Sequence, residues 1–102
     1  MTPNQHIKRL LKDLPTHPGV YQMLDINGVI IYVGKAKNIK KRVSQYFVGS
    51  KDYKTTLMVD YIHSIEPIIT KTEHAALLLE NQLIKQHQPR FNVLLKDDKT
   101  YP

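Results

Sequence analysis

The chain has 102 residues, of which 41% are hydrophobic and 24% are charged, so we expect one domain with a single modest core. A net charge of +6 on so small a domain favours nucleic acid as the partner, with an anionic membrane surface as the alternative. The absence of cysteine excludes disulfides, thiol catalysis and cysteine-ligated zinc. No stretch reaches the roughly 18 apolar residues of a membrane span, and the N-terminus lacks an apolar signal core, so we expect a cytoplasmic protein.

The first predicted element is an amphipathic helix from Asn4 to Leu14, in which apolar residues recur at helical spacing. Asn4 is its expected N-cap, and the prolines at positions 15 and 18 end it. A β-hairpin should follow, because Asn27-Gly28 separates two β-prone runs.

The pairing of this hairpin decides where its two tyrosines point. With Asn27-Gly28 as a two-residue type I′ loop, Met23 pairs with Tyr32 and Tyr21 pairs with Gly34. Side chains alternate along each strand, so Tyr21 and Tyr32 then share one face, and Gly34 leaves space beside Tyr21. A four-residue loop would keep the two tyrosines together, whereas a three-residue loop would separate them.

A basic helix is predicted after the hairpin, from Ile39 to about Phe47, with Asn38 as its N-cap. No Asp or Glu occurs between positions 29 and 51, and the first turn carries Lys40, Lys41 and Arg42. Positive charge there opposes the helix dipole, and a bound anion would resolve the conflict. We therefore expect a phosphate site, with the neighbouring lysines as a solvated, DNA-facing surface: Lys37, Lys40 and Lys41.

Two residues of this region are candidates for direct phosphate contact. Arg42 has a planar fork that suits a bidentate grip, although an exposed helix arginine is an equal alternative. Lys35 follows the glycine that ends the second strand, within short reach of the same place. Tyr46 lies four residues after Arg42, so the two side chains share a helix face.

The second half of the chain reads as a helix over 55–63, a strand over 65–71 at a sheet edge, and a helix from Glu73 to about His87 capped by Thr72. Glu80 lies within the apolar stripe of that last helix, among Ala76, Leu77, Leu83 and Ile84. An unpaired buried carboxylate costs several kcal/mol, which marks Glu80 as functional. The alternative is a salt bridge to a buried Lys or Arg. A lone carboxylate suits one Mg²⁺ or Mn²⁺ that keeps several waters.

Taken singly, Tyr21, Tyr32 and Tyr46 are more typical of core tyrosines, and Asn92 is typical of a turn residue after the helix. Four separated motifs nevertheless occur in an order that resembles the GIY-YIG endonuclease family: Gly19-Val20-Tyr21, Tyr32-Val33-Gly34, Arg42 and a helical Glu80. Both tripeptides carry Val where the family name has Ile, which preserves a β-branched strand residue. The segments GKAKNIKKRVSQYF, LLLENQLIK and PRFNVLLKDDKTYP are similar to the N-terminal domains of bacterial excinuclease subunits of the UvrC type.

The resemblance covers residues 18–102 and implies an α/β fold of the α+β type, with a small three-stranded antiparallel sheet flanked by helices. It carries over Tyr32 as a general base or water-positioning group, with Tyr21 as its partner. Lys35 is implicated in tuning Tyr32 or in contacting phosphate.

The resemblance also assigns roles to residues outside the hairpin. Arg42 would stabilise charge on the phosphate, with Tyr46 hydrogen-bonding nearby. Glu80 would be the single ligand of a Mg²⁺ or Mn²⁺ ion, and Asn92 would be an orienting group.

These observations predict a metal-dependent endonuclease that hydrolyses DNA phosphodiester bonds. The resemblance implies the 3′ incision of nucleotide excision repair on damaged duplex DNA, with UvrB contacted through a segment beyond residue 102. We expect residues 1–102 to form one monomeric GIY-YIG domain, with about 16–95 as its core, from a longer excinuclease subunit. Two alternatives stay open: a non-catalytic nucleic-acid-binding module, and a GIY-YIG nuclease of other biology, such as homing, restriction or structure-specific cleavage.

Overall fold

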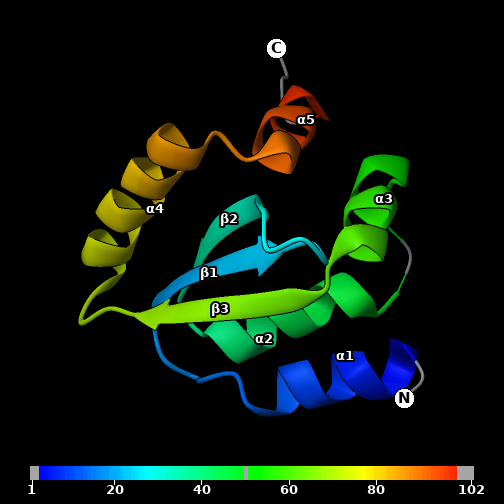
Figure 1. Ribbon diagram of the computed structural model, residues 1–102. Helices are drawn as coiled ribbons and strands as arrows, with labels where there is room; N and C mark the ends of the chain where they lie inside the picture. Colours follow the sequence, from blue (N-terminus) through cyan, green and yellow to red (C-terminus); the bar gives the residue numbers. More distant parts are fainter. Residues whose placement is uncertain (1–2, 50, 99–102) are drawn as a thin grey trace.

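The computed structural model describes residues 3–49 and 51–98, which form one antiparallel sheet with helices on both faces (Figure 1). The strands lie in the order β2-β1-β3, with β1 at Gly19–Leu24, β2 at Ile30–Ala36 and β3 at Ser64–Ile69. The helices are α1 (Pro3–Lys12), α2 (Ile39–Ser44), the 3₁₀ helix η1 (Gln45–Phe47), α3 (Tyr53–Tyr61), α4 (Glu73–His87) and α5 (Arg90–Asp98). The predicted three-stranded α+β fold is confirmed, and β3 is an edge strand as expected. None of the helices in these two ranges is long and apolar enough to cross a membrane.

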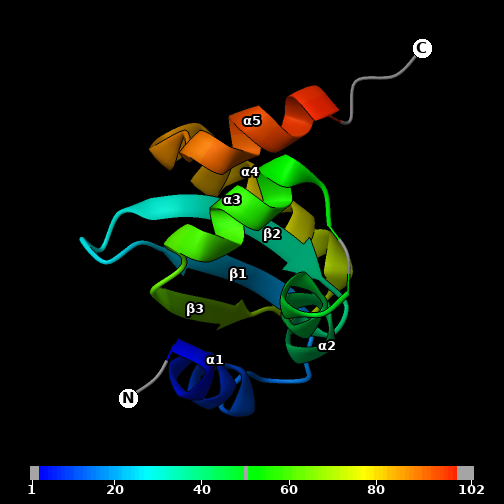
Figure 2. The same cartoon turned by 90° about the vertical axis from the view of Figure 1, so that its right-hand side faces the viewer.

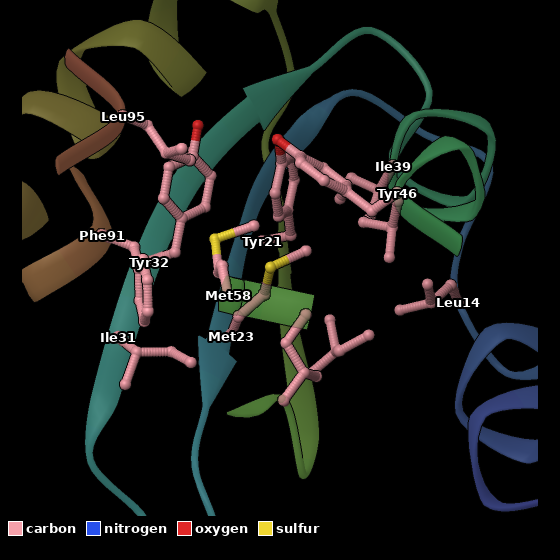
Figure 3. Packing of buried hydrophobic residues seen from close by; sticks show 13 residues of the cluster. Leu14, Tyr21, Met23, Ile31, Tyr32, Ile39, Tyr46, Met58, Phe91 and Leu95 are labelled. Carbon is pink, nitrogen blue, oxygen red and sulfur yellow. The ribbon is translucent and has the colours of Figure 1, made fainter. Parts of the chain in front are cut away.

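The two faces of the sheet have separate cores. On one face, α4 covers Val20 and Val33 with Ala76, Leu83 and Ile84. On the other face, a larger cluster joins β1 and β2 to α2, α3 and α5, as the side chains in Figure 3 show. Figure 2 shows α1 and α2 at one end of this layer and α5 at the other. Strands β1 and β2 thus bury side chains on both faces of the sheet, which explains why β2 is apolar along most of its length.

The hairpin loop differs from the predicted type I′ turn. The amide of Gly28 donates to the carbonyl of Asp25 at 3.0 Å, and the amide of Asp25 donates to the carbonyl of Val29 at 3.0 Å, so three residues form the loop. The Asp25 carboxylate accepts from the amides of Asn27 and Val29, and of these loop residues only Gly28 has a positive φ, of 80°. The side chain of Asp25 therefore selects a turn that needs one left-handed residue instead of two.

A β-bulge restores the predicted pairing beyond this loop. Leu24 pairs with Ile30, but Met23 pairs with Tyr32, so Ile31 is the extra residue on β2. From there Tyr21 pairs with Gly34, as predicted. A three-residue loop alone would have put the two tyrosines on opposite faces, and the bulge cancels its effect.

Other differences concern the ends of helices and the C-terminal segment. Helix α1 begins at Pro3, so the prediction of Asn4 as its N-cap is wrong. Helix α3 begins two residues earlier than predicted, because the carboxylate of Asp52 accepts from the Thr55 amide. Residues 90–98, expected as a loop and tail, form α5, because Phe91 and Leu95 are one turn apart and both bury against the sheet. Asn38 and Thr72 cap α2 and α4 as predicted.

Gly34 is required by the ring that it faces. A Cβ built on Gly34 would overlap the Cζ and hydroxyl oxygen of Tyr21, whose side chain is 1% exposed. We predict that Gly34→Ala lowers the free energy of unfolding by about 1–3 kcal/mol, because the ring has no space into which to move. Urea denaturation measures the change. In a Tyr21→Leu background, Gly34→Ala should lower the free energy of unfolding by clearly less. Equal losses in both backgrounds would contradict the steric explanation.

Candidate active site

Three tyrosines from three elements meet on the α2 side of the sheet. Tyr21 comes from β1, Tyr32 from β2 and Tyr46 from η1, and their ring centroids lie 6.1–6.2 Å apart. The hydroxyls of Tyr21 and Tyr46 are hydrogen-bonded at 2.9 Å. Figure 3 shows that the hydroxyl of Tyr32 points the same way as that of Tyr21. The structure therefore brings together the tyrosines that, taken singly, looked like core residues, and they serve the core as well.

Burial raises the pKa of all three tyrosines above the ordinary value of about 10. Repulsion between neighbouring phenolates, from Tyr32 on Tyr21 and from Tyr46 on Tyr32, raises these pKa values further. The positive charge of Arg42 acts in the opposite direction but does not overcome burial. The phenols consequently keep their protons near neutral pH.

Arg42 lies over this cluster. Its guanidinium carbon is 4.8 Å from the centroid of the Tyr46 ring, so the predicted shared face of Arg42 and Tyr46 is confirmed. One guanidinium nitrogen, Nη1, donates to Oε1 of Gln45 at 3.3 Å. Arg42 is exposed and forms no ion pair within the described residues, so its charge is available to an incoming anion. Gln45 was not predicted, although its i+3 spacing from Arg42 was a usable signal.

Glu80 is half-buried on α4 and forms neither an ion pair nor a hydrogen bond within the described part of the chain. The alternative of a salt bridge to a buried cation is therefore not what the structure shows. Its charge contributes to the raised pKa of Tyr32, so the carboxylate on α4 acts electrostatically on that phenol from the other face of the sheet. The predicted apolar stripe around Glu80 needs one correction: Leu77 is 38% exposed, and Leu79 packs against the core in its stead.

Glu80 and its surroundings suit a hard divalent cation that is held by one carboxylate. No three His, Asp or Glu side chains within residues 3–49 and 51–98 are placed to hold one metal ion together, so a site with three or more such ligands is not present there. Mg²⁺ dehydrates reluctantly and is commonly held by one or two carboxylates and several waters. A half-exposed carboxylate without a protein partner meets that requirement.

Asn92 lies in α5 rather than in a loop, and both ends of its amide are bonded to one residue, Val33. Its Oδ1 accepts from the Val33 amide at 2.8 Å, and its Nδ2 donates to the Val33 carbonyl at 2.8 Å. The side chain thus pairs with the free edge of β2 as a neighbouring strand would. Asn92 fixes α5 against the residue next to Tyr32, and this pairing across 59 positions has no local sequence signal.

The predicted basic residues divide by their contacts. Lys37 forms an exposed ion pair with Glu73 at 3.7 Å, and Lys40 donates to the carbonyl of Lys12 at 3.3 Å. Lys41 is exposed and has no such partner within the described residues. Lys35 is exposed two positions after Val33, so it shares the α4 face of β2, whereas Tyr32 lies on the other face. A direct contact between Lys35 and Tyr32 is not present.

Comparisons with known proteins agree with this arrangement. Residues 17–93 match the UvrC-like GIY-YIG domain family. The chain is 59% identical over 97 residues to the UvrABC system protein C of Francisella tularensis subsp. novicida and 58% identical to that of subsp. holarctica. These alignments cover 94% of this chain but 16% of each relative, so the chain spans about a sixth of the relatives' length.

Solved structures give the same result. The crystal structure of the GIY-YIG N-terminal endonuclease domain of UvrC from Thermotoga maritima, bound to magnesium, superposes with a TM-score of 0.76 at 31% identity. The match covers 89% of this chain and 98% of that one. Further structures of that domain carry single tyrosine-to-phenylalanine or asparagine-to-alanine substitutions and are also bound to a divalent cation.

The raised tyrosine pKa values make a prediction about alkaline pH. A phenol whose pKa is higher in the folded than in the unfolded chain stabilises the fold below the unfolded value of about 10, and this contribution is lost as the pH rises. We predict that stability falls above pH 10, and that Tyr32→Phe falls less steeply than the wild type. Urea denaturation between about pH 8 and 11 measures the slopes. Tyr53→Phe, at a tyrosine that is 79% exposed, is the control, and an identical slope for both variants would contradict the prediction.

The clamp between Asn92 and Val33 makes a second prediction. Asn92→Ala leaves the amide and carbonyl of a buried residue without their partner, so we expect a loss of about 1–3 kcal/mol in the free energy of unfolding. Asn81→Ala, at an exposed position of α4, should change it by less than about 0.5 kcal/mol. Chemical denaturation measures both variants. Similar losses in the two variants would show that the clamp contributes nothing.

Proposed function

The chain belongs to the UvrC-like GIY-YIG domain family, and on that premise we propose that it is a DNA endonuclease domain that hydrolyses phosphodiester bonds with one divalent cation. One observation carries the proposal: three buried phenols and an arginine without a carboxylate partner lie together on one face of the sheet, and a carboxylate on α4 without a cationic partner acts electrostatically on one of those phenols, Tyr32. The magnesium bound in the Thermotoga maritima domain supports the choice of cation.

Glu80 is the residue that would hold the cation. A divalent cation held there would supply positive charge to offset the negative charge of the phosphate and of the departing oxygen. Glu80 suits this role because no cationic side chain of the described residues competes for it. Because its charge acts on Tyr32, a cation held by Glu80 would belong to the same site as the tyrosine cluster.

Arg42 supplies the second positive charge. Stacking on Tyr46 and the bond to Gln45 hold the guanidinium in place while most of its donors stay free for phosphate oxygens. Tyr21 supports Arg42 in two ways: its hydroxyl is bonded to that of Tyr46, which fixes the ring on which Arg42 lies, and Tyr21 also interacts electrostatically with Arg42 itself. These residues place positive charge where negative charge develops in the transition state.

Tyr32 is the residue that faces the attacking water. Burial keeps the phenol of Tyr32 protonated near neutral pH. We therefore propose that Tyr32 positions the water by hydrogen bonding and does not act as a base that is already deprotonated. Asn92 supports this role by holding the adjacent residue, Val33, by both backbone groups. Lys35 and Lys41 are exposed and positioned to meet phosphates away from the scissile bond.

The biology of the whole protein is a further part of the proposal. On the family's pattern, the substrate is damaged duplex DNA, the reaction is the 3′ incision of nucleotide excision repair, and the protein works in the cytoplasm. The domain is proposed to be monomeric by itself and to belong to a longer subunit that contacts UvrB elsewhere. The 59% identity to UvrABC system protein C supports this assignment over homing or restriction biology.

The decisive variant is Glu80→Gln, which removes the charge and keeps the shape. We predict that magnesium-dependent cleavage of duplex DNA falls by about a hundredfold or more, because one charge-stabilising group is lost. Electron paramagnetic resonance should detect one Mn²⁺ site per chain in the wild type and none in the variant. DNA binding in EDTA should not decrease.

The matched control is Glu73→Gln on the same helix, which breaks only the exposed pair with Lys37 and should retain cleavage. Equal cleavage by wild type and Glu80→Gln would overturn the assignment of Glu80. A wild-type chain that binds DNA, takes up no Mn²⁺ and cleaves under no condition would establish the non-catalytic binding module instead.

A further inference from the structure

The net positive charge of this chain comes entirely from its first half. Residues 1–48 carry eight Lys and Arg against two Asp, whereas residues 49–102 carry seven Lys and Arg against seven Asp and Glu. The net charge of +6 thus belongs to the segment that forms α1, the hairpin and α2. Arg42 and the lysines of β2 and α2 account for only part of it, so α1 needs an explanation of its own.

Helix α1 has one apolar face and one cationic face. Its sequence, PNQHIKRLLK, contains three cations and no acid. Leu10 and Leu11 pack against the main core, whereas Lys8, Arg9 and Lys12 are exposed. At about 100° per residue these three cations fall within an arc of about 100°. The buried face anchors α1 to the domain and leaves the cationic face outward.

Helix α2 connects this cationic face to the candidate active site. Ile39 and Val43 are fully buried, so the three residues between them lie around the outer arc of the helix. Arg42 is on the flank that meets Tyr46, and Lys40 is on the flank that reaches the last carbonyl of α1, that of Lys12. Lys41 lies between them and is exposed. The cations therefore continue from the active site across α2 to α1.

Hydrogen bonds hold the loop after α1 to the start of α2 and hold α1 itself to the loop before β3. The amides of Ile39 and Lys40 donate to the carbonyls of His17 and Pro15, in the loop after α1, at 3.2 and 2.9 Å. Within α1, Nε2 of His6 donates to the carbonyl of His63 at 2.6 Å. Figures 1 and 2 both show α1 beside α2 on the same side of the sheet. The cationic surface is consequently formed before any ligand arrives.

Among the described residues, no carboxylate forms an ion pair with this surface, and Asp13, which follows Lys12 in the sequence, forms none. The ion pair between Lys37 and Glu73 is the one that occurs within residues 3–49 and 51–98, and it lies outside α1. Lys8, Arg9, Lys12 and Lys41 thus keep their charge for an external anion. A membrane surface is a poor fit, because the apolar face of α1 is already buried and cannot insert among lipids.

We propose that the outer faces of α1 and α2 form one continuous phosphate-binding surface, along which duplex DNA extends away from the active site. This inference rests on the proposed function for the identity of the ligand. Helix α1 is then a second DNA contact, remote from the chemistry, that adds affinity and orients the duplex without sequence preference. Its lysines and arginine make no contact with the tyrosine cluster, so they act on binding and not on the cleavage step.

The test compares two double variants with the same net charge. Lys8→Gln/Lys12→Gln removes two cations from α1, and Lys71→Gln/Lys85→Gln removes two exposed cations from outside the surface. Glutamine has nearly the helix propensity of lysine, so α1 should stay folded, and circular dichroism checks this. Binding of a fluorescein-labelled duplex is measured by anisotropy in EDTA at several KCl concentrations, so no cleavage or cation is needed.

We expect the α1 variant to reduce the slope of log K against log salt by about 2, since each phosphate that the protein no longer neutralises lowers the slope by about 0.9. The control variant should keep the wild-type slope. Equal slope changes in both variants, or none in the α1 variant, would overturn the proposal. If the α1 variant binds DNA as the wild type does but no longer binds phosphatidylserine vesicles, α1 belongs to a membrane surface instead. Failure of the nuclease proposal shows separately, as absent cleavage with the expected salt slopes still observed.

Discussion

The candidate site depends on the pairing register between β1 and β2. Because side chains alternate along a strand, a shift of one residue would move Tyr32 to the face covered by α4 and leave Tyr21 and Tyr46 without it. The three-residue loop imposes such a shift, and the bulge at Ile31 reverses it. Gly34 is the second condition, because a side chain there would occupy the volume of the Tyr21 ring. The loop, the bulge and Gly34 together thus place Tyr21 and Tyr32 on the same face of the sheet.

Charge separation is the second feature on which the site is built. Arg42 and Glu80 approach the same phenols from α2 and α4 without neutralising one another, and neither has an ion pair within the described residues. Two opposite charges that stay apart can each bind part of a ligand, the guanidinium taking phosphate oxygens and the carboxylate taking a cation. The tyrosines between them are held neutral by burial, so they orient groups by hydrogen bonding and add no third charge.

The same separation extends to the whole molecule. The half of the chain that builds α1, the hairpin and α2 holds all of the net charge, and the half that contributes Glu80 and Asn92 is neutral. A duplex attracted by the first half would meet Glu80, the proposed cation ligand, and Asn92 only around β2, where both halves of the chain come together. Attraction and positioning are therefore supplied by different parts of the fold.

Much of this protein follows from local rules in its sequence. Alternation along the hairpin put Tyr21 and Tyr32 on one face, helical spacing put Arg42 beside Tyr46, and caps at Asn38 and Thr72 began α2 and α4 at the right residues. The order of the motifs indicated the family, which the comparisons confirm. These features depend on neighbours within a few positions, which a sequence displays directly.

Other features arise only when distant segments meet. At the bulge, Ile31 and Tyr32 are both packed in the main core. The clamp joins Asn92 to a residue 59 positions away. Helix α5 is stabilised by the packing of Phe91 and Leu95 in the same core. The environment of Glu80 is of the same kind. Its place in an apolar stripe was visible, but its partial exposure and its lack of a cationic partner are set by which side chains surround α4. Local periodicity thus determined which residues could act together, and long-range packing decided how each is held, because burial and hydrogen-bond partners are properties of contacts between distant segments.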